Sequence, residues 1–255
     1  MPATLRVDDT GARAAILIAH PKGNILTAAI IADVRDALQR CAGVPGLKLI
    51  SIEGQGEDFS FGASIEEHTS AVIRDALPMM HGLIAALLDA PAPTAAIVRG
   101  RCLGGGFELA LACDLIFAAA DAVFGLPEIA LGVFPPAASV LLPLRVGHAR
   151  AGEAVLTGTN RPAAYWEHAG LVAMTARASE LASCVDAWFE EHLAPRSSAA
   201  LRYAAAASRA GIVAQVRGTL PALERLYLDE LMKTHDASEG VDAFLQKRAP
   251  RWRNE

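Results

Sequence analysis

Residues 97–114 combine a short apolar run, three consecutive glycines and a glutamate. The glycines are Gly104, Gly105 and Gly106, and Glu108 follows them in what we expect to be the first turn of a helix. Glycine lets a ligand oxygen approach the backbone closely, and the first amides of a helix are unpaired N–H donors with a partial positive charge. The segment therefore predicts an oxyanion site, although a tight turn with Glu108 complementing the helix dipole explains the same residues.

A second carboxylate stands in strongly apolar surroundings further along the chain. Glu128 lies within residues 124–136, which contain no other charged residue. A carboxylate in such a segment is either exposed on a loop or held in a pocket that raises its pKa. The sequence of this segment alone leaves both interpretations open.

A glycine-bearing loop also follows the strand predicted at residues 47–52. It runs from residue 54 to Ser64, where a further helix is expected to begin, and it contains Gly62 and Ala63. This order of strand, loop and helix repeats that of residues 97–114, and the two strands start 47 residues apart. The spacing indicates a repeated strand-plus-helix unit, while an ordinary connection explains the loop equally well.

The elements that must position these loops are strands in the first 150 residues and helices after them. The β-branched and apolar runs predict strands at residues 5–7, 13–19, 47–52, 94–98, 115–117 and 122–124. The apolar periodicity predicts helices at residues 28–42, 73–88, 107–113, 149–156, 163–169, 178–192, 199–210, 220–232 and 239–247. Gly170 and Gly211 are candidate helix ends.

Charge and residue spacing exclude several classes of protein. The net charge is −5, which argues against a general nucleic-acid binder, and the basic cluster at residues 247–253 is short. The contiguous glycines match neither a dinucleotide-binding fingerprint nor a P-loop, and no GxSxG motif of serine hydrolases is present. The four cysteines and seven histidines show no metal-ligand spacing, so we expect neither a metal site nor a disulfide framework.

The location of the protein is also constrained by its apolar segments. The N-terminal residues lack the basic and apolar regions of a signal peptide. The longest charge-free apolar stretch, residues 129–144, is too short to span a bilayer and contains two consecutive prolines. We therefore expect a soluble, cytoplasmic protein.

Taken together, four segments resemble the crotonase superfamily of enoyl-CoA hydratases and isomerases. They occur in the order typical of that family, at residues 59–63, 104–114, 124–132 and 239–248. The resemblance implies an α/β fold in which ββα repeats are wound into a spiral over residues 1–195. It also implies a helical C-terminal region, residues 196–255, through which subunits form a homotrimer or a dimer of trimers.

The same resemblance implies an acyl-CoA substrate and no separate cofactor, because coenzyme A is part of that substrate. The amides of Ala63 and Gly105 would form an oxyanion hole. Glu108 would orient and deprotonate a water molecule, and Glu128 would deliver a proton. Eight positions match coenzyme A contacts of the family: Lys22, Ile25, Leu26, Ala63, Ser64, Ile65, Phe244 and Lys247. Phe244 and Lys247 would reach the coenzyme A bound to a neighbouring subunit.

The chain departs from the common family pattern at two places. Ser64 stands where typical hydratases carry aspartate, and Phe134, Pro135 and Pro136 replace a glycine-rich helix start with a stiffer and bulkier one. Both changes resemble hydratases of cyclohexa-1,5-diene-1-carbonyl-CoA. We therefore expect water addition to a conjugated C=C bond of a cyclic dienoyl-CoA, with a straight-chain enoyl-CoA hydratase or isomerase as the alternative.

A non-catalytic binding protein of the same fold is a further alternative. The presence of both Glu108 and Glu128 argues against it and favours a hydratase over an isomerase. His68 and His81 could act as additional acids, but a solvent-facing or core histidine explains each of them.

Overall fold

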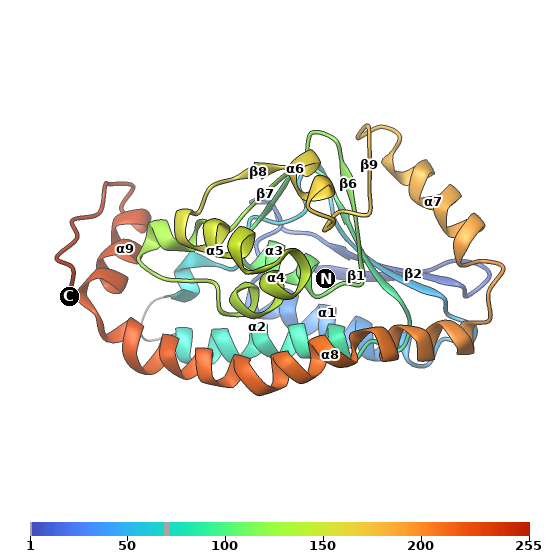
Figure 1. Cartoon of the computed structure of the whole chain (residues 1–255), viewed down its shortest axis with the longest axis horizontal. Helices are drawn as coiled ribbons and strands as arrows, with labels where there is room; N and C mark the ends of the chain where they lie inside the picture. The colour runs from blue at the N-terminus through green and yellow to red at the C-terminus, as the bar shows by residue number, and fades with distance from the viewer. Residues whose placement is uncertain (1, 69–71) are drawn as a thin grey trace.

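The computed structural model, which describes residues 2–68 and 72–255, has a mixed α/β architecture with a C-terminal helical region (Figure 1). The main sheet has the strand order β1-β2-β3-β4-β6-β9, in which β1 and β2 pair antiparallel and the other neighbours pair in parallel. Its strands are Ala3–Val7, Arg13–Ile18, Leu49–Gly54, Thr94–Val98, Leu115–Ala119 and Met174–Ala176. A smaller sheet contains β5 (Arg101–Leu103), β7 (Val123–Gly125) and β8 (Arg161–Pro162).

Helices flank the sheet and form most of the second half of the chain. The α-helices α1 to α9 are Ala28–Cys41, Ile73–Leu88, Gly105–Leu111, Pro136–Val146, His148–Thr157, Ala163–His168, Leu181–His192, Ser198–Arg225 and His235–Leu245. The short helices η1 to η4 are Ile65–His68, Pro127–Leu131, the π-helix Leu226–Glu230 and Leu231–Lys233. Within the described parts of the chain, no helix has both the length and the apolar character that a membrane crossing requires.

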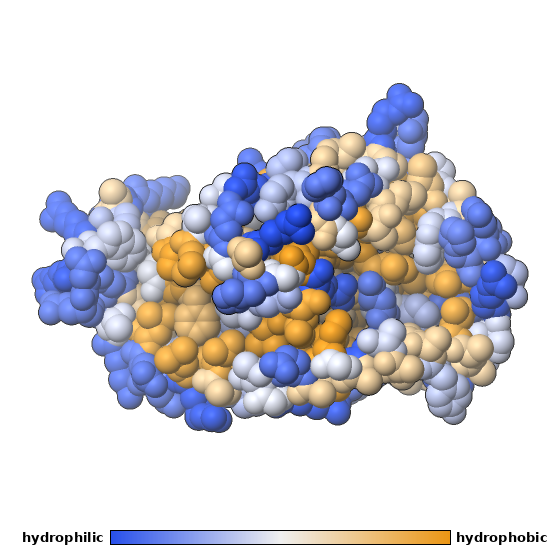
Figure 2. All heavy atoms as spheres, viewed as in Figure 1, coloured by the Kyte–Doolittle hydropathy of each residue, from blue (hydrophilic) through white to orange (hydrophobic). Residues whose placement is uncertain are grey.

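The long helix α8 runs along one edge of the molecule beside α2, and the C-terminus lies at one end (Figure 1). On the same face, hydrophobic side chains gather between α8 and α5, towards the end of the molecule that carries α9 (Figure 2). Large apolar side chains are exposed on α4 at Leu144, on η3 at Leu226, and on α9 at Phe244 and Leu245.

The parallel sheet brings the two glycine-bearing loops together. All five residues of β4 are buried, as expected for a central strand covered on both faces. Strands β3 and β4 are parallel neighbours, so their carboxyl ends meet at the same edge of the sheet. The loop that contains Gly62 follows β3, and the loop that contains Gly104 follows β4 and β5. Bridges between Ser60 and Cys102 and between Leu26 and Ala63 connect these segments.

Several predicted elements are confirmed, and one prediction about helix ends is wrong. Helix α2 and strand β4 have the bounds expected from the sequence, and Gly170, with φ of 78°, follows α6 closely. Gly211, in contrast, lies inside α8, which replaces the predicted helix at 199–210 and the first six residues of that at 220–232. A glycine costs a helix about 1 kcal/mol, and packing of α8 against α2 and α4 outweighs that cost.

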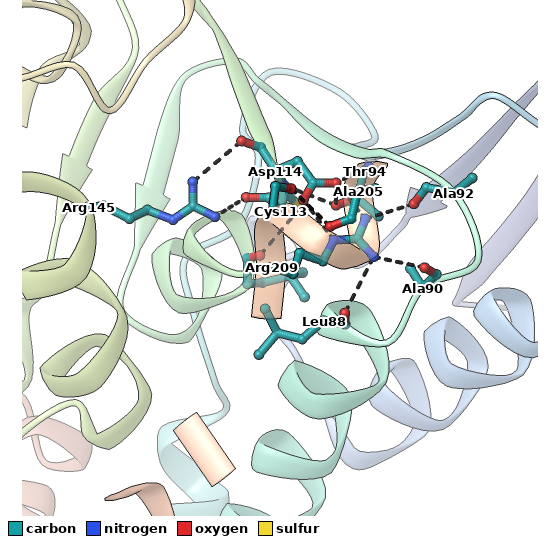
Figure 3. Close-up of polar contacts among 11 residues, drawn as sticks. Leu88, Ala90, Ala92, Thr94, Cys113, Asp114, Arg145, Ala205 and Arg209 are labelled. Carbon is teal, nitrogen blue, oxygen red and sulfur yellow. Dashed lines mark hydrogen bonds and ion pairs between the residues drawn. The ribbon is translucent and has the colours of Figure 1, made fainter. Parts of the chain in front are cut away.

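A buried arginine joins α8 to the rest of the fold (Figure 3). Arg209 is 4% exposed and donates from Nε to Asp114 Oδ1 over 2.7 Å. Its terminal nitrogens donate to the backbone oxygens of Ala90 and Ala92, each over 2.8 Å. The other oxygen of Asp114, Oδ2, accepts from a terminal nitrogen of Arg209 and from the Thr94 amide, the latter over 2.7 Å. This cluster fixes α8 against the end of α2, the start of β4 and the residues that follow α3.

Candidate active site

A mostly apolar cavity lies where the two glycine-bearing loops meet. Both glutamates singled out by the sequence, Glu108 and Glu128, line it together with Ala63 and Gly105. The other residues that line it are Leu26, Ile31, Phe61, Gly62, Ser64, Ile65, Glu67, Ile73, Ala76, Leu77, Met80, Gly104, Pro127, Leu131, Phe134, Pro135, Pro136 and Tyr227. A cavity with apolar walls and a few convergent polar groups is the usual form of a small-molecule site.

The backbone amides of Ala63 and Gly105 lie close together at the wall of this cavity. A Cβ atom added to Gly105 would stand 3.2 Å from the Ala63 nitrogen, and one added to Gly62 would stand 3.1 Å from the Gly105 nitrogen. Gly62 has φ of 98°, a conformation that favours glycine. Neither amide donates a hydrogen bond to any residue of the described chain. Both N–H groups are therefore free to donate to a ligand.

Glu108 is buried one turn into α3. The helix begins after Gly104, whose φ of 49° and ψ of −126° favour glycine, and Glu108 is 5% exposed. Its Oε1 accepts the Ala138 amide of α4 over 2.9 Å. Burial raises the pKa of Glu108, and the Ala138 amide, the charge of His81 and the Ala137 amide each oppose that rise.

The carboxyl group of Glu128 lies against Gly104. A Cβ atom added to Gly104 would stand 2.6 Å from Glu128 Oε1, so only glycine leaves room for this carboxyl group. The Oε2 atom is buried and has no hydrogen-bond partner among the described residues. Burial, followed by the charge of Glu108, raises the pKa of Glu128 to about 8.

The two carboxyl groups are thus placed in different surroundings. Glu108 accepts a backbone hydrogen bond that favours its charged form, whereas the buried Oε2 of Glu128 has no such partner. The pKa values of both carboxyl groups are raised, and Glu128, with a pKa of about 8, is a carboxylic acid at neutral pH. A base, an acid and two N–H donors around one cavity can add or remove water next to a carbonyl group whose oxygen becomes negatively charged.

The residues expected to contact coenzyme A are only partly brought together in this chain. Leu26, Ser64 and Ile65 line the cavity with Ala63. Lys22 is exposed and Ile25 is half-buried, and neither is among the described residues that line the cavity. Phe244, 54% exposed near the end of α9, and Lys247 beyond that helix do not line it either. A role for these four in binding coenzyme A stays a prediction.

The structure describes the surroundings of His81 but not those of His68, the two histidines considered as additional acids. His81 is buried in α2, and its Nδ1 lies 2.5 Å from Glu224 Oε2, as fits a core histidine with a partner. His68 ends η1 next to residues 69–71, which lie outside the described chain.

Tyr227 was missed by the sequence analysis. It is 1% exposed and lines the cavity from the π-helix η3. A single tyrosine in a helical pattern does not indicate that its side chain lines a cavity. The π-helical turn that directs the side chain there depends on tertiary packing.

Comparison with known proteins agrees with this geometry. A model of the enoyl-CoA hydratase/isomerase family matches residues 10–255. The chain belongs to the enoyl-CoA hydratase/isomerase family. It is 43% identical to cyclohexa-1,5-dienecarbonyl-CoA hydratase of Thauera aromatica over 99% of this chain and 97% of that protein. It is 33% identical to 2,3-dehydroadipyl-CoA hydratase of Escherichia coli K12 over 89% of each.

The fold agrees with solved structures of the same family. The chain matches an enoyl-CoA hydratase from Mycobacterium avium subsp. paratuberculosis K-10 with a TM-score of 0.87 and 30% identity, over 100% of this chain and 99% of that one. The predicted α/β crotonase fold and the prediction of an enoyl-CoA hydratase-type hydro-lyase are both confirmed. The substrate of this member of the enoyl-CoA hydratase/isomerase family is therefore an acyl-CoA thioester.

Proposed function

We propose that this enoyl-CoA hydratase acts on a cyclic dienoyl-CoA and adds water through an enolate held by Ala63 and Gly105. The observation that carries the proposal is the convergence of two unpaired amides and two unlike carboxyl groups on one apolar cavity. The 43% identity to a cyclohexa-1,5-dienecarbonyl-CoA hydratase supports the cyclic substrate.

The two amides account for the stabilisation of the enolate. When water adds to a C=C bond conjugated with a thioester, negative charge develops on the thioester oxygen. N–H donors that are already in position need no reorganisation during the reaction, and the removal of one such donor costs about 3–4 kcal/mol of transition-state stabilisation in other enzymes. Ala63 and Gly105 supply these donors from two loops that the parallel sheet holds together.

The two carboxyl groups account for the proton transfers. Glu108 accepts a proton from water as the oxygen of that water bonds to the ring carbon. The electron pair of the C=C bond shifts towards the carbonyl carbon, and the C=O pair moves onto the thioester oxygen. Glu128, protonated below its pKa of about 8, gives a proton to the carbon that becomes CH as the enolate collapses. The two glutamates have then exchanged protonation states, and proton transfer between them restores the starting state.

The wall of the cavity supports a ring rather than a flexible chain. Phe134 and Tyr227 meet with ring centroids 5.5 Å apart at an interplanar angle of 67°, and Pro135 and Pro136 continue this wall. Aromatic rings and prolines form a stiff apolar wall against which a ring can pack. A straight-chain enoyl group has no need of such a surface.

A panel of substrates tests the proposal. Crotonyl-CoA, cyclohexenecarbonyl-CoA and cyclohexadienecarbonyl-CoA are each incubated with the protein, and products are identified by mass spectrometry. We expect the cyclic dienoyl-CoA to gain one water with the highest kcat/KM. A strong preference for crotonyl-CoA would replace the cyclic substrate by a straight-chain one, and no turnover of any of the three would overturn the proposal.

We also infer that the chain assembles into a trimer or a dimer of trimers. Phe244 and Leu245 are 54% and 41% exposed near the end of α9, and hydrophobic residues gather on the face shown in Figure 2. Exposed apolar surface of this kind is typical of subunit contacts. Sedimentation equilibrium at micromolar concentration should give three or six times the chain mass, and a monomer would contradict the inference.

A further inference from the structure

Tyr227 reaches the active-site cavity from a part of the chain that the family motifs do not include. It belongs to the π-helix Leu226–Glu230, which joins α8 to the C-terminal elements. π-helical turns are rare and are frequently found at functional sites. Tyr227 lines the same cavity as Glu108 and Glu128. Its phenol group is therefore a further polar side chain at the site of the proposed chemistry.

The ring of Tyr227 is held firmly. It packs edge to face on Phe134, and it belongs to a small apolar cluster that is separate from the main core. The other buried members of this cluster are Ile73, Leu77, Val133, Met232 and Ala237. Because the cluster fixes the ring, the hydroxyl group has a defined position at the end of a rigid side chain.

The hydroxyl group of Tyr227 has no hydrogen-bond partner among the described residues, although Tyr227 is 1% exposed. Because Tyr227 lines the cavity and its hydroxyl is not among the fully buried polar atoms that lack a partner, a ligand in the cavity can supply the partner. Burial, followed by the charges of Glu128 and Glu108, raises the pKa of Tyr227. The phenol consequently stays neutral over the physiological pH range and is available as a donor.

We propose that Tyr227 is a further catalytic residue, whose O–H donates a hydrogen bond to the oxygen that moves between water and the ring carbon. This inference rests on the proposed hydration. That oxygen gives one proton to Glu108 and keeps a lone pair that can accept the phenol hydrogen. After addition, the oxygen of the product's ring hydroxyl still has a lone pair that can accept the hydrogen bond from Tyr227. Tyr227 would thereby orient the water and recognise the hydroxylated product.

The kinetic test compares two tyrosine variants. Tyr227→Phe removes the hydroxyl group and keeps the ring that packs on Phe134. Tyr203→Phe makes the same change at an exposed position of α8, 73% exposed, and is the matched control. We expect Tyr227→Phe to lower kcat by about 10- to 100-fold with KM changed by less than about threefold, because the interaction is with the reacting oxygen. Tyr203→Phe should match the unchanged protein, and normal kcat in Tyr227→Phe would overturn the inference.

A binding measurement separates this inference from the proposed function. In the Glu108→Gln background, calorimetry compares hydroxycyclohexenecarbonyl-CoA with cyclohexenecarbonyl-CoA. We expect the hydroxylated ligand to bind about tenfold more tightly, and we expect Tyr227→Phe, but not Tyr203→Phe, to abolish that preference. A preference that survives Tyr227→Phe would overturn the role of Tyr227. Failure of the unchanged protein to hydrate any enoyl-CoA would instead overturn the proposed function, whatever the binding result.

Discussion

The two ends of the segment that contains α3 carry clusters of ionisable residues that differ in how completely their polar atoms are hydrogen-bonded. Beyond its C-terminal end, Arg209 and Asp114 have hydrogen-bond partners for the guanidinium nitrogens and for both carboxylate oxygens (Figure 3). At its N-terminal end, Glu108 accepts one amide and the Oε2 of Glu128 has no partner among the described residues. Fully satisfied buried charges give a fixed structure, whereas incompletely satisfied carboxyl groups are available to exchange protons with a ligand.

The catalytic side of this comparison predicts the largest effect. Glu108→Gln and Glu128→Gln keep the shape of each side chain but remove its ability to exchange a proton. Each is expected to lower the kcat of hydration by about 10³-fold while acyl-CoA still binds. Steady-state kinetics and calorimetric binding measure the two quantities. Glu190→Gln, an exposed position of α7, is the matched control, and near-normal turnover in both active-site variants would eliminate the proposed roles.

For the Arg209–Asp114 cluster, the comparison predicts a loss of stability when the pair is broken. Arg209→Met leaves the carboxylate of Asp114 without its arginine and is expected to lower the free energy of unfolding by about 3–5 kcal/mol. Arg217→Met is the matched control in the same helix, because Arg217 is 63% exposed and pairs with Asp89 over 2.7 Å. Exposed pairs contribute only about 0–1 kcal/mol. Equal effects of the two substitutions in urea denaturation would contradict the distinction.

Glu128→Gln is expected to raise stability while it abolishes activity. The pKa of Glu128 rises from 4.5 to about 8 on folding, so its ionisation costs the folded state increasingly as pH climbs between those values. Removing the carboxyl group should raise the free energy of unfolding by about 2 kcal/mol at pH 8, a figure reduced because the residue is half-buried. The gain should vanish near pH 4. Urea denaturation at both pH values checks the sign.

The rate of hydration should also fall at alkaline pH. The reaction needs Glu128 in its protonated form, and this form is lost as pH rises through about 8. We expect kcat to be level just below that pH and to decline about tenfold per pH unit above it. A kcat that stays constant to pH 10 would show that Glu128 does not act as the acid in this direction.

Much of the fold and part of the site could be predicted from local patterns. The bounds of α2 and β4, the loops at Gly62 and Gly104, and the place of Glu108 in the first turn of a helix agree with the sequence analysis. The helix end expected at Gly211 was wrong, because the cost of one glycine is smaller than the packing of the whole of α8. Helix α4 was not predicted, since its apolar residues show no helical periodicity around Pro136 and Pro143.

The sequence by itself determined the features that depend on neighbouring residues: the glycines that allow close backbone approach, the start of α3, and the position of Glu108 in its first turn. Only the tertiary structure decided the features that join distant segments. The Ala138 amide reaches Glu108 across 30 residues, and Arg209 reaches Asp114 across 95. The pKa of a carboxyl group and the partners of a phenol depend on whatever packs around them, and spacing along the chain does not encode that packing.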